Sequence, residues 1–145
     1  MNQLILDVSR KTIVADDQKQ IAELTRVALS RSDIIVFSGG LGPTEDDLTR
    51  EGVADALHLE LQRDPEMLAA FEVRAAARGW KMTANNYKQA DVIAGAIVLA
   101  NSNGTAPGQW ITHKHDGRER ILLLLPGPPH ELKAIFEEQC LGRLR

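Results

Sequence analysis

The residues best suited to chemistry lie in one stretch, in which a run of glycines is followed by two aspartates. Gly39, Gly40 and Gly42 carry no side chain, so a loop built from them lets backbone N–H groups approach an anion such as a phosphate. Asp46 and Asp47 follow closely, and two carboxylates can hold a hard cation such as Mg²⁺ that bridges to phosphate oxygens. We therefore expect a phosphate and metal site here. Taken alone, the same residues also fit a tight turn and a helix cap.

The glycine loop matches neither of two common phosphate-binding motifs. It lacks the Gly-Lys-Ser/Thr sequence of a Walker A loop, and its glycines do not have the spacing of a dinucleotide-binding fingerprint. The sequence therefore gives no support to either of those classes.

Three further segments carry groups that suit a ligand. Asn86 offers an amide that can both donate to and accept from a ribose, a pterin or the edge of a base. The loops at 104–108 and 126–129 each lie beside an expected strand end, where ligands of open α/β sheets bind. Glu131, in the first turn after the prolines, could ligate a metal or activate water. Each also has an ordinary explanation as a turn, a loop or a first-turn carboxylate.

The histidines and the cysteine carry weaker signals. His113 and His115 would share one face of a strand, but no further ligand pattern accompanies them, which favours a solvated edge over a zinc site. Cys140 falls on the apolar stripe of the last expected helix, which predicts a buried and unreactive thiol. It is the only cysteine, so it has no partner for an intrachain disulfide.

The elements that must position these residues alternate between helical patterns and short apolar runs, which predicts an α/β domain. Ile34 to Phe37 is apolar on both faces, as expected for an interior strand that leads directly into the glycine loop. Asp116 and Gly117 form a hairpin-type turn before a strand over 118–125. We further expect strands over 9–14, 96–100 and 109–113, and helices after Asp16 or Asp17, after a Thr44–Asp47 capping box, from Asp64, from Thr83, and after the prolines at 126–129.

Length and composition narrow the class of protein. The 145 residues are 43% hydrophobic and 26% charged, which suits a single globular domain over 1–145. The net charge of -3 argues against a nucleic-acid partner. The longest clean apolar run is Ile121 to Leu125, so we expect no membrane span, and the N-terminus lacks the pattern of a signal peptide. A cytoplasmic protein is the resulting expectation.

Four segments in this order closely resemble the competence/damage-inducible protein A (CinA) family: 38–49, 83–90, 104–108 and 125–132. The similarity is to its molybdopterin-binding-like (MoCF) domain and covers nearly the whole chain. It implies a three-layer αβα sandwich with a mostly parallel, mixed sheet.

The resemblance also implies a function. Some members are ADP-ribose pyrophosphatases that depend on a divalent metal, so we expect Mg²⁺ or Co²⁺ here, and related enzymes bind a pterin nucleotide. Carried over by motif, Asp46 and Asp47 would bind the metal and act in catalysis with Glu131. The expected substrate-binding residues are Ser38, Gly39, Gly40, Gly42, Thr44, Asn86, Gly104, Pro107, Gly108 and Gly127.

The chain departs from the family pattern in three ways. Its first residues resemble the end of the family's first helix, so the domain looks short by one β-α unit, which would leave a strand edge and apolar faces exposed. A homo-oligomer that covers them is therefore expected. The family's Val-Gly-Asp reads Val14-Ala15-Asp16, and we expect no amidase domain of the kind that often follows in this family. The alternatives to a pyrophosphatase are thus a molybdopterin-binding or adenylyl-transfer domain, and a truncated, non-catalytic nucleotide-binding or oligomer module.

Overall fold

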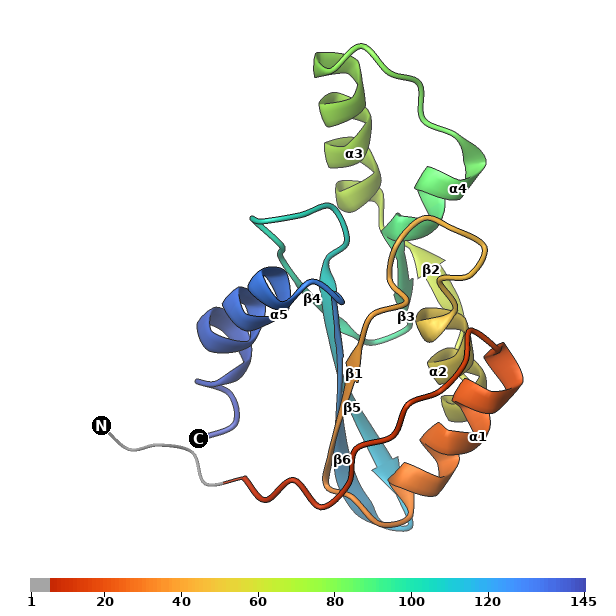
Figure 1. The fold of residues 1–145 in the computed structure, drawn as a ribbon, viewed down its shortest axis with the longest axis vertical. Coiled ribbons are helices and arrows are strands. Elements are labelled where there is room, and N and C mark those ends of the chain that lie inside the picture. Colours follow the sequence, from red (N-terminus) through yellow and green to blue (C-terminus); the bar gives the residue numbers. More distant parts are fainter. Residues whose placement is uncertain (1–5) are drawn as a thin grey trace.

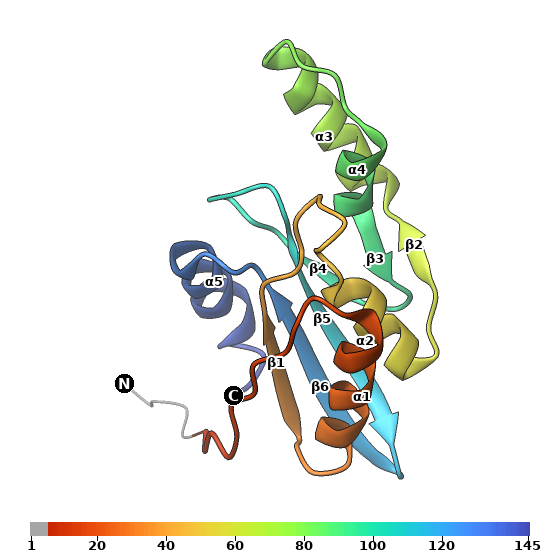
Figure 2. The same cartoon turned by 45° about the vertical axis from the view of Figure 1, so that its right-hand side comes forward.

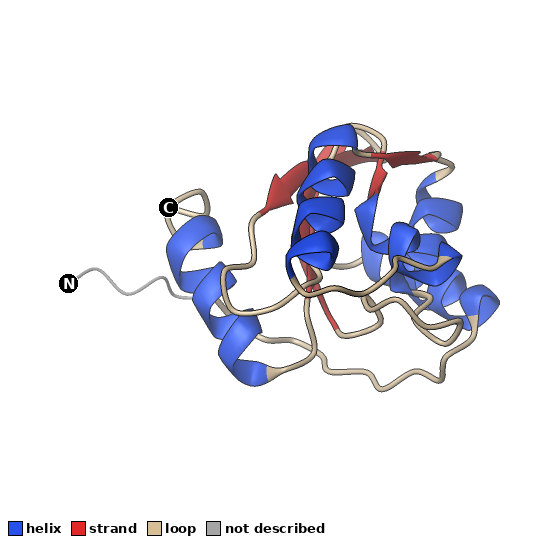
Figure 3. Cartoon of the chain, turned by 90° about the horizontal axis from the view of Figure 1, so that it is seen from above, coloured by secondary structure: helices blue, strands red, loops and turns tan. Residues whose placement is uncertain are grey.

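The computed structural model describes residues 6–145, and these form a sheet with helices on both faces (Figure 1). Helices α1 (Gln18–Leu29) and α2 (Thr49–Leu57) pack on one face, and α5 (Pro129–Ile135) packs on the other. Viewed from above, the helices lie to either side of the strands (Figure 3). The expected α/β architecture is confirmed.

The main sheet has four strands in the order β1 (Ile34–Ser38), β6 (Arg118–Leu125), β5 (Gly108–His115) and β4 (Ile97–Leu99). β1 runs parallel to β6, whereas β6 with β5 and β5 with β4 are antiparallel. The sheet is mixed, as expected, but its parallel part is smaller than predicted. The tight turn at Asp116 and Gly117, both with positive φ, is the reason, because it folds β6 directly back on β5.

Strand β6 supplies the centre of the core. Its residues 122–125 are all leucines with 0% exposure. Leu122 and Leu124 pack into the cluster under α1 and α2, while Leu123 and Leu125 pack into the cluster under α5. A continuous apolar run is required here because alternate side chains point to two covered faces.

A second unit projects from one end of the sheet (Figure 2). It consists of the antiparallel pair β2 (Leu61–Arg63) and β3 (Asp91–Ile93), with α3 (Pro65–Ala77), α4 (Ala84–Tyr87) and η1 (Lys88–Ala90) between them. The buried Gln109 of β5 joins this unit to the main sheet. Its Oε1 accepts from Ile93 N at 2.9 Å and its Nε2 donates to Asp91 O at 3.1 Å.

Several local predictions are confirmed by their hydrogen bonds. Asp17 caps α1 by accepting from Gln20 N at 3.0 Å, and Asp64 caps α3 by accepting from Met67 N at 2.9 Å. The last helix forms as expected and continues into one π-helical stretch, η2 (Phe136–Cys140), which buries Cys140. None of the helices within residues 6–145 has the length and apolar character needed to cross a bilayer.

Two predicted elements are wrong. Residues 9–14 form no strand, and Ile13 is 91% exposed, because no neighbouring strand supplies hydrogen bonds or a covered face to this segment. The helix expected from the Thr44–Asp47 box begins only at Thr49, since Asp47 closes a turn inside the loop.

Strand β1 lies at one edge of the main sheet. Among the described residues, β1 has a strand neighbour only on its β6 side. Val36 in the middle of β1 is 51% exposed. The β1 edge therefore presents both backbone groups and apolar surface.

Candidate functional site

The candidate site lies where β1 and β6 end. Because the two strands are parallel, Ser38 pairs with Leu125 in register, and the segments that follow both strands leave the sheet at the same end. Gly39 N donates to Leu125 O at 2.9 Å. A Cβ on Gly127 would lie 3.4 Å from the Cα of Gly39, so the two glycine-containing loops run side by side.

The backbone of the glycine loop is held in a conformation that suits glycine. Gly39 and Gly40 have φ of +93° and +71°. A Cβ on Gly40 would lie 2.0 Å from the hydroxyl of Thr49, and that hydroxyl donates to Gly39 O at 2.8 Å. The amide of Gly40 donates to no acceptor among the described residues, so it remains available to an anion.

Arg50, on helix α2, holds the middle of the glycine loop through two hydrogen bonds. It is 1% exposed, and it donates from Nη1 to Leu41 O at 2.6 Å and from Nη2 to Gly42 O at 3.0 Å. Burial lowers the pKa of the guanidinium, while the carboxylates of Glu51, Asp91 and Asp47 raise it. The sequence reasoning missed this residue.

Asp47 is committed to the loop itself. Its Oδ2 accepts from Thr44 N at 2.9 Å and from Thr44 Oγ1 at 2.7 Å. Burial alone would raise the pKa of Asp47. Hydrogen bonds from Thr44 and Gly42, together with the charge of Lys88, outweigh this effect, so the pKa lies below its ordinary value. Asp47 is therefore an ionised carboxylate that closes a turn in the loop, and it does not cap helix α2, whose N-cap is Leu48.

Asp46 is the carboxylate of the pair that remains free. It is exposed and makes no hydrogen bond or ion pair with another described residue. Within residues 6–145, no three Asp, Glu, His or Cys side chains gather into a metal-binding group. This donor set fits a magnesium ion held by one or two carboxylates together with substrate phosphates, and does not fit an ion held by protein ligands alone.

Glu131 lies in the first turn of α5, and its side chain packs against the loop that precedes β5. Its side chain is 14% exposed, and its Oε2 accepts from Asn101 Nδ2 at 2.7 Å. The same Asn101 nitrogen donates to Ala106 O at 2.8 Å. A Cβ on Gly104 would lie 2.3 Å from Glu131 Oε2, so glycine at this position makes room for the carboxylate.

Two contacts bring the projecting unit to the same place. Lys88 Nζ donates to Thr44 O at 2.8 Å, which ties η1 to the glycine loop. Gln89 Nε2 donates to Thr105 Oγ1 at 3.2 Å, which ties η1 to the loop at 101–107. The four segments singled out by the sequence therefore meet in one region.

The predicted site residues differ in what they are free to do. Asn86 lies on α4, where its Oδ1 closes a capping box by accepting from Thr83 N and Thr83 Oγ1, both at 3.0 Å. Pro107 and Gly108 are buried, and a Cβ on Gly108 would lie 2.9 Å from Leu124 O in the sheet. These two residues shape the strand junction and do not face solvent.

The residues missed by the sequence reasoning are those that connect the loops. Arg50, Lys88, Gln89 and Asn101 bind backbone or side-chain groups of other segments. Lys88 belongs to a segment that the sequence singled out and Arg50 directly follows one, but their partners lie 44 and 9 residues away in the chain. Only the folded arrangement reveals these contacts.

The fold and the site define a class of protein: an α/β domain with a mixed sheet in which the loops at the ends of adjacent parallel strands lie side by side. The model of the family described as "Probable molybdopterin binding domain" matches residues 1–145. The chain belongs to this family, and within it to the CinA-like proteins that its relatives represent.

Those relatives are similar along almost the whole chain. A CinA-like protein of Koribacter versatilis is 52% identical over 145 residues, which are 100% of this chain and 35% of that protein. A putative competence-damage inducible protein of Symbiobacterium thermophilum is 45% identical over 93% of this chain and 31% of its own length. The chain thus spans about a third of the length of these curated relatives.

A solved structure shares the fold. The protein CinA of Thermoplasma acidophilum, described with unknown function, superposes with a TM-score of 0.71 at 35% identity. The match covers 84% of this chain and 69% of that one.

Proposed function

We propose that this domain hydrolyses the pyrophosphate bond of a nucleotide sugar of the ADP-ribose type. The observation that carries the proposal is the contact between Gly39 and Gly127, which sets two loops side by side at the ends of parallel strands. Ligands of α/β sheets bind at such an edge. The family resemblance points to the same class of substrate.

The backbone of the glycine loop would bind the pyrophosphate. The amide of Gly40 is free to donate to a phosphate oxygen, and Arg50 holds the neighbouring carbonyls so that the loop need not reorganise when a ligand arrives. Lys88, which contacts Thr44 O and forms a 3.5 Å ion pair with Glu51, places an ammonium group beside the loop. Together these groups would offset charge on the phosphates.

Asp46 is the residue we assign to the divalent metal, with Asp47 as a second ligand through its remaining acceptor capacity. Such an ion, when bound, stabilises charge on the phosphates and lowers the pKa of a bound water. Asp46 suits the role because none of its oxygens is committed to another described residue.

Glu131 is the residue we assign to the attacking water. Asn101 holds its Oε2, and Oε1, which lies 3.9 Å from Nε2 of His130, is the oxygen that would accept the proton as the water oxygen bonds to phosphorus. The bridging phosphorus–oxygen bond breaks in the same displacement. ADP-ribose would thereby yield AMP and ribose 5-phosphate.

The test is AMP release from ADP-ribose with Mg²⁺ or Co²⁺. We expect turnover by the wild-type chain, and a fall of about a hundredfold or more for Asp46→Asn. Asp116→Asn is a matched control, because Asp116 is an exposed aspartate of the β5–β6 turn and its change leaves the loop intact. Equal rates in the wild type and Asp46→Asn would show that Asp46 has no role in the reaction. No turnover by the folded wild-type chain would refute the proposed hydrolase activity.

Binding of a molybdopterin is a second candidate, because the matching family is described by that ligand. The same loop edge would take the pterin phosphate. Pterin binding by a chain that neither binds nor cleaves ADP-ribose would favour this function over hydrolysis.

A further inference from the structure

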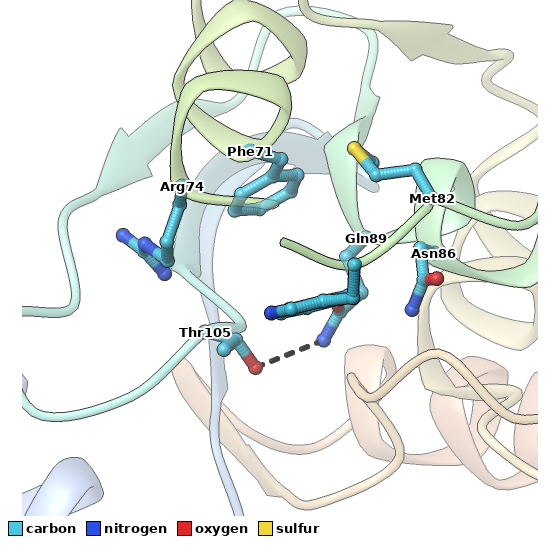
Figure 4. Close-up of a pocket in the computed structure, with 7 residues that line it drawn as sticks. Phe71, Arg74, Met82, Asn86, Gln89 and Thr105 are labelled. Atoms are coloured by element: carbon cyan, nitrogen blue, oxygen red, sulfur yellow. Dashed lines mark hydrogen bonds between the residues drawn. The ribbon is translucent and has the colours of Figure 1, made fainter. Parts of the chain in front are cut away.

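A small pocket lies in the projecting unit, between α3, the segment that follows it, α4 and η1 (Figure 4). It is a shallow hollow that opens to solvent, and the space within its bounds, open solvent included, is about 280 Å³. It is lined by Phe71, Arg74, Trp80, Met82, Asn86, Gln89 and Thr105. Of these, only Asn86 was singled out by the sequence.

The apolar part of the lining suits a flat ring. Phe71, Trp80 and Met82 are large side chains around one hollow, and Trp80 remains 44% exposed. Two aromatic rings and a thioether are polarisable surfaces on which a planar heteroaromatic ring stacks.

The polar part of the lining suits the edge of such a ring and a negatively charged remainder. The guanidinium of Arg74 lies 5.9 Å from the centre of the Phe71 ring. The lining includes this one cation and no carboxylate. The Nδ2 of Asn86 has no hydrogen-bond partner among the described residues, because the capping contacts with Thr83 use only Oδ1. The amide edge of Asn86 is therefore available to a ligand.

The pocket is structurally linked to the phosphate loop. Lys88 lies between Asn86 and Gln89 in the sequence and donates to Thr44 O at 2.8 Å. On the other side, Gln89 donates to Thr105, the neighbour of Gly104, against which Glu131 packs (Figure 4). A ligand with its phosphates at the glycine loop would thus have a pocket for a planar ring on the other side of α4 and η1.

We propose that this pocket binds the nucleobase of the substrate, with Phe71 and Trp80 as the stacking surfaces and Asn86 at the ring edge. The inference rests on the proposed function for the identity of the ligand as a nucleotide. It adds the residues that select a base over a sugar phosphate.

The test uses Trp80 as its own reporter. The chain has two tryptophans, and Trp110→Phe leaves Trp80 alone. AMP, ribose 5-phosphate and a pterin are titrated into this variant without metal, so that no turnover occurs. Should Trp110→Phe fail to fold, the wild-type chain serves instead, because Trp110 is 6% exposed and contributes a nearly constant background.

We expect AMP to quench the fluorescence of Trp80 and ribose 5-phosphate to leave it unchanged. Binding of AMP to Phe71→Ala and Trp80→Ala, followed by calorimetry, is expected to weaken by at least about fivefold, the low end of the effect of losing one base-stacking ring. Val73→Ala is the matched control, since Val73 also lies on α3 but is 70% exposed and outside the lining. It is expected to bind AMP as the wild type does.

Unchanged AMP affinity in both Phe71→Ala and Trp80→Ala overturns the inference. Equal quenching by ribose 5-phosphate does so as well, and quenching by the pterin in place of AMP assigns the pocket to the second candidate function. Failure of the inference and failure of the hydrolase are separable. If both variants hydrolyse ADP-ribose with an unchanged KM, only the assignment of the pocket is refuted. If AMP binding depends on Trp80 but the chain shows no turnover, only the proposed hydrolase activity is refuted.

Discussion

The guanidinium of Arg50 donates to the carbonyl oxygen of Leu41 at 2.6 Å from a position that is almost entirely buried. A buried charge is costly unless it is well paired, so this contact is a strong constraint on the loop. The loop that we assign to phosphate binding is therefore positioned before any ligand arrives. Preorganised donors of this kind are the usual means by which enzymes stabilise charge.

Removal of Arg50 is expected to destabilise the fold. Arg50→Met leaves the buried carbonyls of Leu41 and Gly42 without donors, and we expect a loss of about 2–4 kcal/mol in the free energy of unfolding. Denaturant titration measures this directly. Arg26→Met is the control, because Arg26 has a side chain 49% exposed in a 3.8 Å ion pair with Asp55, and should change stability by less than about 1 kcal/mol. Equal effects of the two substitutions would refute a special role for Arg50.

A methyl group at position 104 is expected to impair activity more than stability. The Cβ of Gly104→Ala would lie 2.3–2.6 Å from the carboxylate atoms of Glu131, which must then move away from Asn101. We expect kcat for ADP-ribose to fall by about 10- to 100-fold, as for other small displacements of a catalytic group. Gly142→Ala, whose Cβ would meet nothing within 4 Å, is expected to keep wild-type activity. A wild-type rate for Gly104→Ala would mean that the position of Glu131 is unimportant.

The charge of Asp47 is expected to stabilise the fold in a pH-dependent way. Its pKa in the folded chain is lower than the ordinary value of 3.8, so the stabilisation is present above that value and is lost as the pH falls through the folded pKa. Asp47→Asn should therefore lower the free energy of unfolding by about 1 kcal/mol at pH 7, and the difference from wild type should shrink below about pH 4. Unfolding curves at several pH values measure it. A difference that is constant with pH would show that charge is irrelevant there.

Cys140 is expected to be inert while the chain is folded. It is 0% exposed in the cluster under α5, and burial raises the pKa of its thiol, against a smaller lowering by Arg143. A thiol reagent at neutral pH should label the chain only after unfolding in guanidinium chloride. Labelling of the native protein at the rate of a free thiol would contradict the described packing.

The sequence predicts best those parts of the fold in which local pattern and burial agree. Residues 118–125 form a strand with the predicted bounds because the leucines and the Asp116–Gly117 turn specify the same structure. The aspartate caps of α1 and α3 are equally local, since each depends on a contact three residues along the chain. Residues 9–14 share the pattern of a strand but lack a partner, which no local pattern can reveal.

The short strands β2 and β3 and the contacts between loops could not be predicted. Leu61–Arg63 and Asp91–Ile93 are three residues each and are defined by their pairing with one another. For the site, the motifs identified which segments matter, but not which side chains hold them together. The motif does not show that Asp47 closes a turn with Thr44, nor that Arg50, which looked like an ordinary helical residue, supports the loop.

The central claim is that the loops after β1 and β6 form one binding site for a nucleotide diphosphate. The most direct test is to titrate ADP-ribose into the isotopically labelled chain and to follow the backbone amide resonances of its glycines. We predict that the amides of Gly39, Gly40, Gly42 and Gly127 shift together with one dissociation constant, while those of Gly117 and Gly142 stay in place. Shifts confined to other residues, or a glycine loop that does not respond to saturating ligand, would contradict the account.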